Sequence, residues 1–451
     1  MKCKGFYLTR QWLPLVFVVL VILPGSIKTL AKVEVSVCKY NPMTSEFLEN
    51  TNLNKWIDWI EKLSGAEPVQ ISGLNTFIQS RETRLMFTDQ PHARAYDYVL
   101  EQTRNWYPEA NITQHEYDIF DIKAKNLIVT LPGINNPDEI ILLSAHLDAV
   151  AINSTIAPGA NDNGTGSATL LEAARILRQF KFGRTIQLVW FTGEEDGLAG
   201  SGAFLREYSS TNFKAVINMD MFGWDGDGDQ CFDIHTDSND PGSQMIGECF
   251  ADLISAYNLD LQHEIVDTGR SDQLTFQWAG ISAVGIHENV TDNLLEDRCI
   301  GTDMNSHYHS IEDTVNKNLT PDYAFDIAQA GLATVMELAT PLSACFTETI
   351  QLSVMTESPE SVLLQWNSIP DARTYRVYRS NYGCEGSWQV IGETANLDWQ
   401  DSEVIEDWPT QYQVEAIGSD GVCASQSSNC VLVGPQPPPV YEKLFLPLIT
   451  D

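Results

Sequence analysis

The stretch Pro158-Gly159-Ala160-Asn161-Asp162-Asn163-Gly164-Thr165-Gly166 is the part of the chain around which its fold and its chemistry are organised. Its small, turn-forming residues let the backbone bend sharply, and the apolar run at 168–180 that follows predicts a helix. Asp162 is therefore expected to be a carboxylate held in a fixed position just before that helix.

Histidine and acidic residues also follow the apolar runs on either side of this stretch. The run 140–143 is followed by Ser-Ala-His-Leu-Asp at 144–148, and the run 186–191 by Gly-Glu-Glu-Asp-Gly at 193–197. Short apolar runs bounded in this way predict buried strands. Each of these acids and the imidazole is thus expected just beyond the end of a strand.

Strand-like and helix-like patterns alternate over the larger part of the chain, after a helical region from about residue 32 to 110. The expected strands are 114–120, 126–131, 139–144, 185–191, 215–219 and 283–286, and the expected helices are 168–180, 200–208, 243–257 and 321–338. Such alternation predicts an α/β fold in which helices cover both faces of a mixed, mostly parallel central sheet. The domain is expected to span residues 45–341.

The pattern changes after residue 339 to short strands without a helical stretch. These strands are expected at 350–355, 361–366, 374–379, 388–391, 411–417 and 431–433. They predict an all-β sandwich domain over residues 345–434. Trp366, the strand with Tyr375 and Tyr378, and Tyr412 resemble the core markers of fibronectin type III modules. A Pro-rich tail is expected at 435–451.

The N-terminus has the features of a secretory signal. Three basic residues within the first ten precede the apolar run 12–24, and Thr-Leu-Ala follows at 29–31. Residues 1–31 are therefore interpreted as a signal peptide and the protein as secreted. The apolar run is short for a membrane span, and an uncleaved anchor is the alternative. Residues 32–44 would be a short N-terminal segment or part of a propeptide.

Charge and cysteine content narrow the class of protein. The chain has 27 basic and 61 acidic residues, a net charge of −34, which argues against nucleic acid or an anionic membrane as a partner. Loss of Cys3 with the signal would leave eight cysteines, an even number that predicts disulfides rather than catalytic thiols in an exported chain. Among the many possible pairings, Cys423 with Cys430 or with Cys384 is expected.

Five side chains suit a pair of metal ions. Peptide-bond hydrolysis at neutral pH needs a strong nucleophile and a polarised carbonyl, and two bound metals supply both. Zinc accepts imidazole and carboxylate ligands, and open α/β sheets place ligands at the carboxyl ends of their strands. The candidates are His146, Asp162, Glu195, Asp220 and His309, and the expected cofactors are two Zn²⁺ per chain.

The motifs that contain these residues resemble those of the secreted bacterial leucyl aminopeptidases. They are His146-Leu147-Asp148, Gly159 to Gly166, Gly193-Glu194-Glu195, Asn218-Met219-Asp220 and His309-Ser310-Ile311-Glu312-Asp313. This family of co-catalytic dizinc metallopeptidases also includes glutamate carboxypeptidases and glutaminyl cyclases. The resemblance covers roughly residues 45–341 and implies a zinc exopeptidase-like fold. Ser271-Asp272-Gln273 departs from the Ser-Asp-His of many relatives, which concerns the specificity pocket rather than the ligands.

The resemblance implies a role for each ligand. Asp162 would bridge both zinc ions, Glu195 and His309 would complete one site, and His146 and Asp220 would complete the other. The activity implied is that of an aminopeptidase acting on peptides with a free N-terminus. The protein is expected to be a monomer without an integral membrane domain once the signal has been removed.

Two further residues are expected to be catalytic. By resemblance Glu194 is the general base, which takes a proton from the water between the metals and passes it to the departing amine. Asp148 lies two residues beyond His146 and is expected to accept a hydrogen bond that fixes the tautomer of this imidazole. The resemblance also implies a cis peptide bond between Asp162 and Asn163.

Three other functions remain open at this stage. A glutaminyl cyclase would have the same fold but, by resemblance, one zinc, and a carboxypeptidase should need arginines to bind the substrate carboxylate. No arginine lies between Arg206 and Arg270, which weakens the second alternative. A secreted binding protein without catalysis, with the sandwich as its working part, is disfavoured by the intact Glu194.

A separate acidic motif, Asp225-Gly226-Asp227-Gly228-Asp229, has two interpretations. The alternating aspartates are similar to the start of a calcium-binding loop, but Gln230 and Thr236 occupy positions where an EF-hand needs glycine and glutamate. A polar turn is the preferred interpretation, and a surface calcium site is the alternative.

Overall fold

The computed structural model describes residues 38–434 except 89, 268, 291–298, 300, 301, 304, 359, 360, 382, 385–387 and 405–408. The predicted signal peptide 1–31, residues 32–37 of the segment after it and the tail 435–451 lie outside the described residues. Among the helices that are described, none has both the length and the apolar character that crossing a membrane requires.

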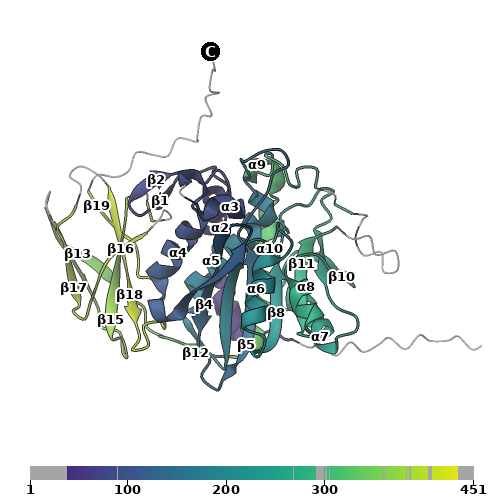
Figure 1. Cartoon of the computed structure of the whole chain (residues 1–451). Helices are drawn as coiled ribbons and strands as arrows, with labels where there is room; N and C mark the ends of the chain where they lie inside the picture. The colour runs from purple at the N-terminus through teal and green to yellow at the C-terminus, as the bar shows by residue number, and fades with distance from the viewer. Residues whose placement is uncertain are drawn as a thin grey trace, which may run out of the picture. The chain divides into compact units, whose positions relative to one another are not determined.

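A mixed sheet of eight strands lies at the centre of the α/β region (Figure 1). In spatial order its strands are β10 (Gln262–Val266), β9 (Cys231–His235), β11 (Ala283–Glu288), β8 (Asn212–Met219), β5 (Asn136–His146), β7 (Arg184–Phe191), β4 (Ile122–Leu131) and β3 (Ile112–Ile119). Four of the seven neighbouring pairs are parallel, including β8 with β5 and β5 with β7, and three are antiparallel. The mixed sheet was predicted, and its parallel strands lie at its centre.

Helices cover both faces of this sheet, because alternate strand residues enter different hydrophobic cores. Ile141 and Leu143 belong to the larger core, whereas Ile140 and Leu142 belong to a smaller one on the opposite face. The larger core also contains residues of α1 (Pro42–Glu49), α2 (Leu53–Leu63), α4 (Ala95–Trp106), α5 (Thr165–Leu177), α7 (Pro241–Tyr257) and α10 (Pro321–Ala339). Phe204 of α6 (Ala199–Glu207) and Phe276 of α8 (Gln273–Trp278) fill the smaller core.

The long helices begin and end at residues that suit helix termini. The side chain of Asp240 accepts hydrogen bonds from the amides of Gly242 and Ser243 at the start of α7, and Asn258 ends this helix in the left-handed conformation, with φ of 56°. Pro321 occupies the first turn of α10, where its missing N–H costs nothing. The remaining elements of this region are β1 (Val69–Ile71), β2 (Leu74–Thr76), α3 (Thr83–Met86), β6 (Phe180–Phe182), α9 (Val315–Asn318) and β12 (Pro341–Ala344).

Strand β9 is an element that the sequence pattern did not predict. Its five residues, Cys-Phe-Asp-Ile-His, are all buried. Asp233 and His235 interrupt the apolar run, and burial on both faces removes the alternation by which an exposed strand is recognised. Neighbouring β10 and helix α8 were also not predicted, since both are short.

The C-terminal region consists of two small antiparallel sheets that share one hydrophobic core. One contains β13 (Leu352–Ser358), β14 (Ser361–Trp366) and β17 (Asp398–Asp401); the other contains β16 (Gln389–Thr394), β15 (Thr374–Ser380), β18 (Thr410–Ile417) and β19 (Val431–Val433). Trp366, Tyr375 and Tyr412 are buried in the shared core. The region is all-β as expected, with β17 as the strand that the sequence did not indicate.

All eight described cysteines form disulfides, but one expected pairing is wrong. The bonds join Cys38 to Cys249, Cys231 to Cys299, Cys345 to Cys423, and Cys384 to Cys430. Cys423 therefore pairs with neither Cys430 nor Cys384. The cause is its position. The amides of Cys345 and Ala424 donate to the adjacent carbonyls of Gln179 and Arg178, which brings the two ends of the β region together beside helix α5.

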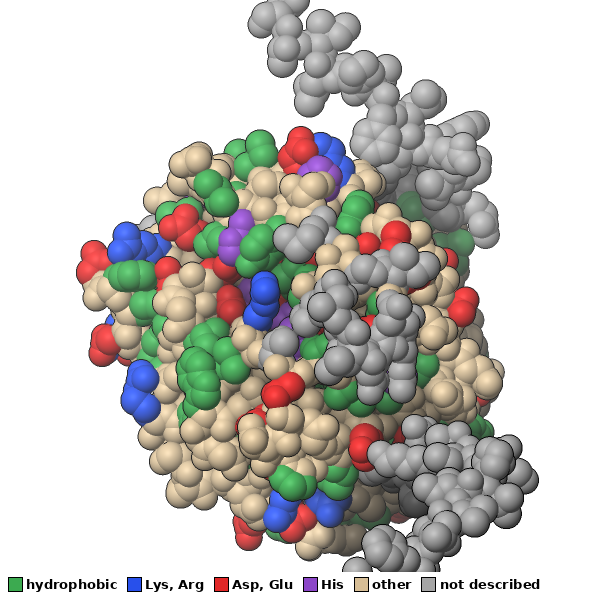
Figure 2. Space-filling view, turned by 90° about the vertical axis from the view of Figure 1, so that its right-hand side faces the viewer, with side chains coloured by type: hydrophobic (Ala, Val, Ile, Leu, Met, Phe, Trp, Pro, Cys, Tyr) green, Lys and Arg blue, Asp and Glu red, His purple; other side chains and the backbone are tan. Residues whose placement is uncertain are grey.

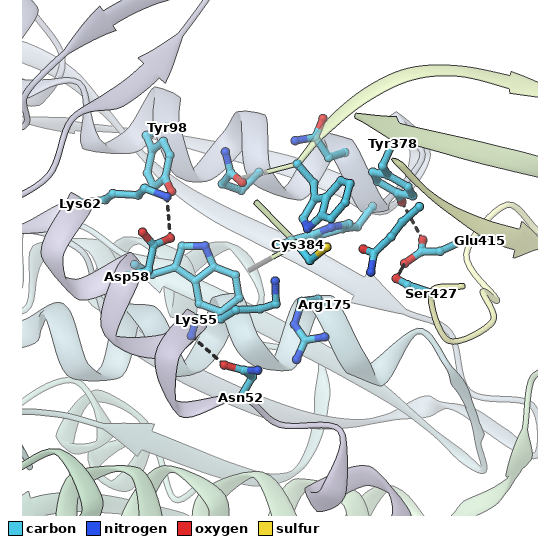
Figure 3. Close-up of a pocket in the computed structure, with 16 residues that line it drawn as sticks. Asn52, Lys55, Asp58, Lys62, Tyr98, Arg175, Tyr378, Cys384, Glu415 and Ser427 are labelled. Carbon is cyan, nitrogen blue, oxygen red and sulfur yellow. Dashed lines mark hydrogen bonds and ion pairs between the residues drawn. The ribbon is translucent and has the colours of Figure 1, made fainter. Parts of the chain in front are cut away.

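A buried ion pair joins the two regions next to a cavity of about 270 Å³. Arg178 Nη2 lies 2.6 Å from Glu415 Oε2, and the hydroxyls of Tyr378 and Ser427 donate to the same carboxylate. Figure 3 shows Tyr378, Glu415 and Ser427 on one side of the cavity and Asp58, Lys62 and Tyr98 of the helical region on the other. The β region is thus attached to the α/β region by this buried ion pair and by the backbone hydrogen bonds of Cys345 and Ala424.

We expect Glu415→Ala to lower the free energy of unfolding by about 3–5 kcal/mol, because it leaves the buried guanidinium of Arg178 without its counter-charge. Guanidinium chloride unfolding measures the change. The matched control is Glu393→Ala, which removes the half-exposed partner of Arg376 and should cost less than about 1 kcal/mol. If both variants lost the same unfolding free energy, burial would not explain the contribution of the Arg178–Glu415 pair.

The same pair has a predicted pH dependence. Although burial favours the neutral form, Arg178 and Tyr378 hold the pKa of Glu415 below its ordinary value. A carboxylate with a lowered pKa stabilises the fold above its unfolded-state pKa of about 4.3, and this contribution is lost as the pH falls through the lower folded-state value. Acid unfolding of Glu415→Gln should therefore depend less on pH below about 4 than that of the original protein.

Candidate metal centre

Three adjacent parallel strands direct predicted ligands to one edge of the sheet. His146 is the last residue of β5, Asp220 comes directly after β8, and Glu195 lies four residues beyond the end of β7. Because β8, β5 and β7 are neighbours and run in the same direction, their carboxyl ends meet. Asp162 and His309 reach the same place from loops.

The side chain of Asp162 lies between the two imidazoles. Its Oδ1 is 3.2 Å from Nε2 of His146, and its Oδ2 is 3.2 Å from Nε2 of His309. Nε2 of His146 is also 3.0 Å from Oδ1 of Asp220, and Nε2 of His309 is 3.0 Å from Oε2 of Glu195. The five predicted ligands therefore form two groups of three that share Asp162.

The spacing of these atoms fits metal ligands. Tetrahedral ligands about 2.0–2.2 Å from a zinc ion lie roughly 3.3–3.6 Å apart, and the distances observed here are slightly shorter. Nε2 of His309 and Oε1 of Glu195 are buried and make no hydrogen bond of acceptable geometry, although carboxylate oxygens lie near the imidazole nitrogen. Atoms arranged around a common point, rather than aimed at one another, have this property. The imidazole and carboxylate donor set fits zinc.

The electrostatics of the cluster favour positive charge at two points. Burial would lower the pKa of His309, but Asp162 and Glu195 raise it to about 10. Burial likewise opposes the charged form of His146, and Asp220, Asp148 and Asp162 raise its pKa well above the ordinary value. Cations bound between these groups would satisfy the same negative potential.

The loop that carries Asp162 is held by a carboxylate from a distant segment. Asp313 accepts hydrogen bonds from the backbone amides of Asn161 and Asp162, at 2.9 and 3.0 Å, and a third from the side chain of Asn318. Gly159 has a φ of 53°, and a Cβ there would collide with the carbonyl oxygen of Asp162. The peptide bond between Asp162 and Asn163 is cis, as the resemblance implied.

Asp148 makes different contacts from those expected. Its Oδ1 is 3.7 Å from Nδ1 of His146, too far for a hydrogen bond, and the backbone carbonyl of Asp148 lies at 3.1 Å instead. The carboxylate accepts the amides of Glu194 and Glu195, at 3.3 and 3.2 Å, and the hydroxyl of Thr83. The carboxylate thus lies beside the imidazole at ion-pair distance, and the nearer acceptor for Nδ1 is the carbonyl of the same residue. The side chain also holds the loop of the two glutamates.

Glu194 lies beside the cluster and is largely enclosed. Its carboxylate can approach His146 and Glu195 closely enough for a common ion. Burial, opposed by His146 and assisted by Asp220 and Asp272, raises the pKa of Glu194 to about 10, and burial raises that of Glu195 to about 7. These carboxyls would both be readily ionised only next to additional positive charge.

Arg81 is a residue of the site that sequence analysis missed. It is fully buried, and its guanidinium donates to the carbonyls of Leu147, Pro158 and Gly159, at 2.8, 2.6 and 2.6 Å. One side chain thus joins the end of β5 to the loop of Asp162. Burial lowers the pKa of Arg81 to about 10, while nearby carboxylates such as Asp313 oppose the shift. No motif marks this residue, since its partners are backbone atoms.

The cluster reaches the surface through His309, whose side chain is 22% exposed and stacks on Tyr308 at 3.7 Å between ring centroids. His146, Asp162 and Asp220 are buried. On the face that Figure 2 shows, histidine side chains lie close to acidic ones near the middle, and Lys and Arg side chains stand singly or in small groups.

The sheet edge and its imidazole and carboxylate cluster define an α/β protein with a candidate metal-binding site. Residues 126–344 match the family model described as "Peptidase family M28". Over 209 residues the chain is 31% identical to aminopeptidase Y of Saccharomyces cerevisiae. This alignment covers 45% of this chain and 36% of the yeast protein. Over 269 residues it is 28% identical to a probable leucine aminopeptidase of Trichophyton verrucosum, with 56% and 68% coverage. Over this part of its length the chain is thus similar to proteins named as aminopeptidases.

A solved structure has the same fold. The LapA aminopeptidase of Legionella pneumophila superposes with a TM-score of 0.54 at 21% identity, over 70% of this chain and 79% of that one. Both sequence relatives are fungal. The predicted resemblance to leucine aminopeptidases is therefore supported, but its restriction to bacterial members is not. This chain spans about a third of the length of aminopeptidase Y and about two thirds of that of the Trichophyton protein.

Proposed function

We propose that the protein is a secreted aminopeptidase that holds two zinc ions and removes the first residue of peptides with a free N-terminus. One observation carries the proposal. The two oxygens of Asp162 face different imidazoles, those of His146 and His309, so that one carboxylate is shared by two three-residue groups. A bridging carboxylate of this kind is what a co-catalytic metal pair requires.

The five ligands divide between two ions. Asp162, Glu195 and His309 would hold one zinc, and Asp162, His146 and Asp220 would hold the other. Bound zinc would supply Lewis-acid polarisation of the scissile carbonyl and would acidify a water molecule. Asp313 and Arg81 fix the loop of Asp162, so that the shared ligand keeps its place.

Glu194 is proposed as the general base. It would take a proton from the attacking water and return it to the amine of the departing peptide. Its enclosed position next to His146 and Glu195 supports this role. Asp148 is then a positioning residue, because its carboxylate accepts the amides of Glu194 and Glu195 and so fixes both side chains relative to the ligands.

The remaining parts of the proposal concern the rest of the chain. Secretion is supported by the four disulfides, which persist in oxidising environments. The paired antiparallel sheets after residue 345, with Trp366 and Tyr412 in their core, suit a fibronectin type III-like module. We propose that the chain works as a monomer.

The function is tested with a free-amine peptide amide and its N-acetylated twin, both offered to the zinc-loaded protein. Because an exopeptidase recognises the α-amine, the acetylated peptide should be cleaved at least about 10²-fold more slowly. Liquid chromatography of the released amino acid measures the rates. Equal cleavage of both peptides would contradict the proposal. Release of ammonia from an N-terminal glutamine without cleavage would establish the cyclase instead.

A further inference from the structure

A second group of carboxylates lies outside the proposed zinc cluster. Asp225, Asp227 and Asp229 alternate with glycines in the loop between β8 and β9, and Asp303 joins them from a segment much later in the chain. One carboxylate oxygen of each lies within 4.8 Å of those of the others. Four negative groups so close together repel one another unless a cation lies between them.

Asp303 is brought to this loop by covalent and backbone contacts. The disulfide between Cys231 and Cys299 connects the residues just after the loop to those just before Asp303. The amide of Asp303 then donates to the carbonyl of Asn289 at 2.7 Å. The meeting of Asp303 with the three loop carboxylates is therefore fixed by long-range contacts of the fold.

The side chain of Asp303 shows an unsatisfied acceptor at this place. It is 6% exposed, and its buried Oδ2 has no hydrogen-bond partner among the described residues. A Cβ on Gly226 would lie 2.9 Å from its Oδ1, so the carboxylate lies directly against the loop. Burial, together with the charges of Asp227 and Asp225, raises the pKa of Asp303 to about 6. The backbone of Gly226 satisfies part of this carboxylate, and a bound cation would offset the free-energy cost of the buried oxygen that has no partner.

The loop itself is shaped by local hydrogen bonds. Oδ1 of Asp225 accepts the amide of Gly228 at 2.9 Å, and Oδ1 of Asp227 accepts that of Asp229 at 3.1 Å. In an EF-hand, ligands at the first, third and fifth positions are completed by a glutamate at the twelfth. Here that position is Thr236, and Asp303 supplies from a distant segment the acidic oxygen that the local sequence lacks.

We propose that Asp225, Asp227, Asp229 and Asp303 bind one Ca²⁺, at a site separate from the proposed zinc cluster. The donors are all carboxylate oxygens, without imidazole or thiolate, which favours a hard cation over zinc. Calcium accepts six to eight oxygens in flexible geometry, which suits a loop and a segment that meet from different directions. Magnesium would demand a nearly ideal octahedron.

The expected role of this ion is structural. The loop continues from Asp220 through Gly223, whose amide donates to Asn161 at 2.7 Å, and Trp224, whose amide donates to Glu288 at 3.3 Å. These contacts connect the start of the calcium loop to the segment that carries Asp162. A Ca²⁺ ion would hold the loop 225–229 against the segment that carries Asp303. Because it would bind the folded state in preference to the unfolded state, it would stabilise the folded state by mass action.

Terbium luminescence tests the site directly, since Tb³⁺ substitutes for Ca²⁺ and is excited through a nearby indole. Trp224 is well placed for this, because Gly226 lies against both its Nε1 and the carboxylate of Asp303. We expect sensitised emission from the zinc-loaded full chain that Ca²⁺ displaces. Asp303→Asn and Asp227→Asn should each weaken Tb³⁺ binding at least about 10-fold, since affinity follows the number of charged ligands.

The controls distinguish this site from the zinc cluster and from general surface binding. Asp118→Asn removes an exposed carboxylate elsewhere and should leave Tb³⁺ binding unchanged. Asp227 is exposed, so its variant should fold even if Asp303→Asn does not. Unchanged emission in Asp227→Asn, or emission that Ca²⁺ fails to displace, would overturn the proposal.

Thermal unfolding gives an independent measurement. With Ca²⁺ at about 100 times its dissociation constant, the Tm of the zinc-loaded protein should rise by roughly 3 °C. The rise should disappear in Asp227→Asn and persist in Asp118→Asn. A calcium-induced rise that persists in Asp227→Asn would place the binding elsewhere and overturn the assignment.

Discussion

Glu194→Gln is expected to lower kcat for peptide-amide hydrolysis by about 10²–10⁴-fold, while the zinc content of the protein stays unchanged. The amide keeps the size of the carboxylate but cannot accept the proton of the attacking water or return it to the departing amine. Glu194 belongs to neither group of three that contains Asp162, so its replacement should leave both ions bound. Steady-state kinetics with metal analysis of the same samples measures both quantities.

The neighbouring Asp196 provides the matched control. It lies two residues away, on the same loop, and its side chain is exposed. Asp196→Asn should therefore change kcat by less than about 3-fold, since exposed groups away from the reacting atoms contribute little. A similar loss in both variants would mean that the loop, rather than the proton transfer, is affected. Full activity of Glu194→Gln would refute the role of this residue as the base.

Much of the site could be predicted because its chemistry follows strand ends. His146 and Asp220 stand where apolar runs stop, and parallel neighbouring strands must bring such residues to one edge. Asp162 was recognisable by the turn residues around it. His309 comes from a loop without strand periodicity, and its place was implied only by the resemblance of its motif.

Contacts made through the backbone could not be predicted in this way. Arg81 donates to four backbone carbonyls, and any residue type offers a carbonyl, so its partners leave no trace in the sequence. Asp148 was assigned to His146 because the two are close in sequence, but its carboxylate turns to the amides of Glu194 and Glu195. Spacing along the sequence indicates that two residues are close, but it does not indicate which way their side chains point.

Long-range pairings were likewise beyond local patterns. Cys423 was expected to pair with Cys430 or Cys384, yet Cys345, which is 78 residues away, is its partner. Asp303 belongs to no motif, and only the folded chain places it against the aspartates of 225–229. In both cases the residues are far apart in the sequence, and only the tertiary structure brings them into contact.

Asp162→Ala is expected to remove more zinc than the loss of any ligand that serves one ion only. In the proposed arrangement its Oδ1 lies next to His146 and its Oδ2 next to His309, so that one substitution takes a ligand from each group of three. Each ion would keep two protein ligands, fewer than the three that catalytic zinc sites use. kcat/KM should fall by at least about 10³-fold, since both the Lewis acid and the acidified water would be lost.

Comparison with Asp220→Ala tests whether Asp162 is a ligand of both zinc ions. Asp220 contacts His146 but belongs to only one group, so its removal should release about one ion and leave the other bound. Native mass spectrometry of zinc-loaded protein, followed over increasing concentrations of a chelator, resolves species with two, one and no zinc ions. If Asp162→Ala and Asp220→Ala lose zinc in the same proportion, Asp162 is a ligand of one ion only. The protein would then have two separate metal sites, and a water shared between them would no longer explain hydrolysis.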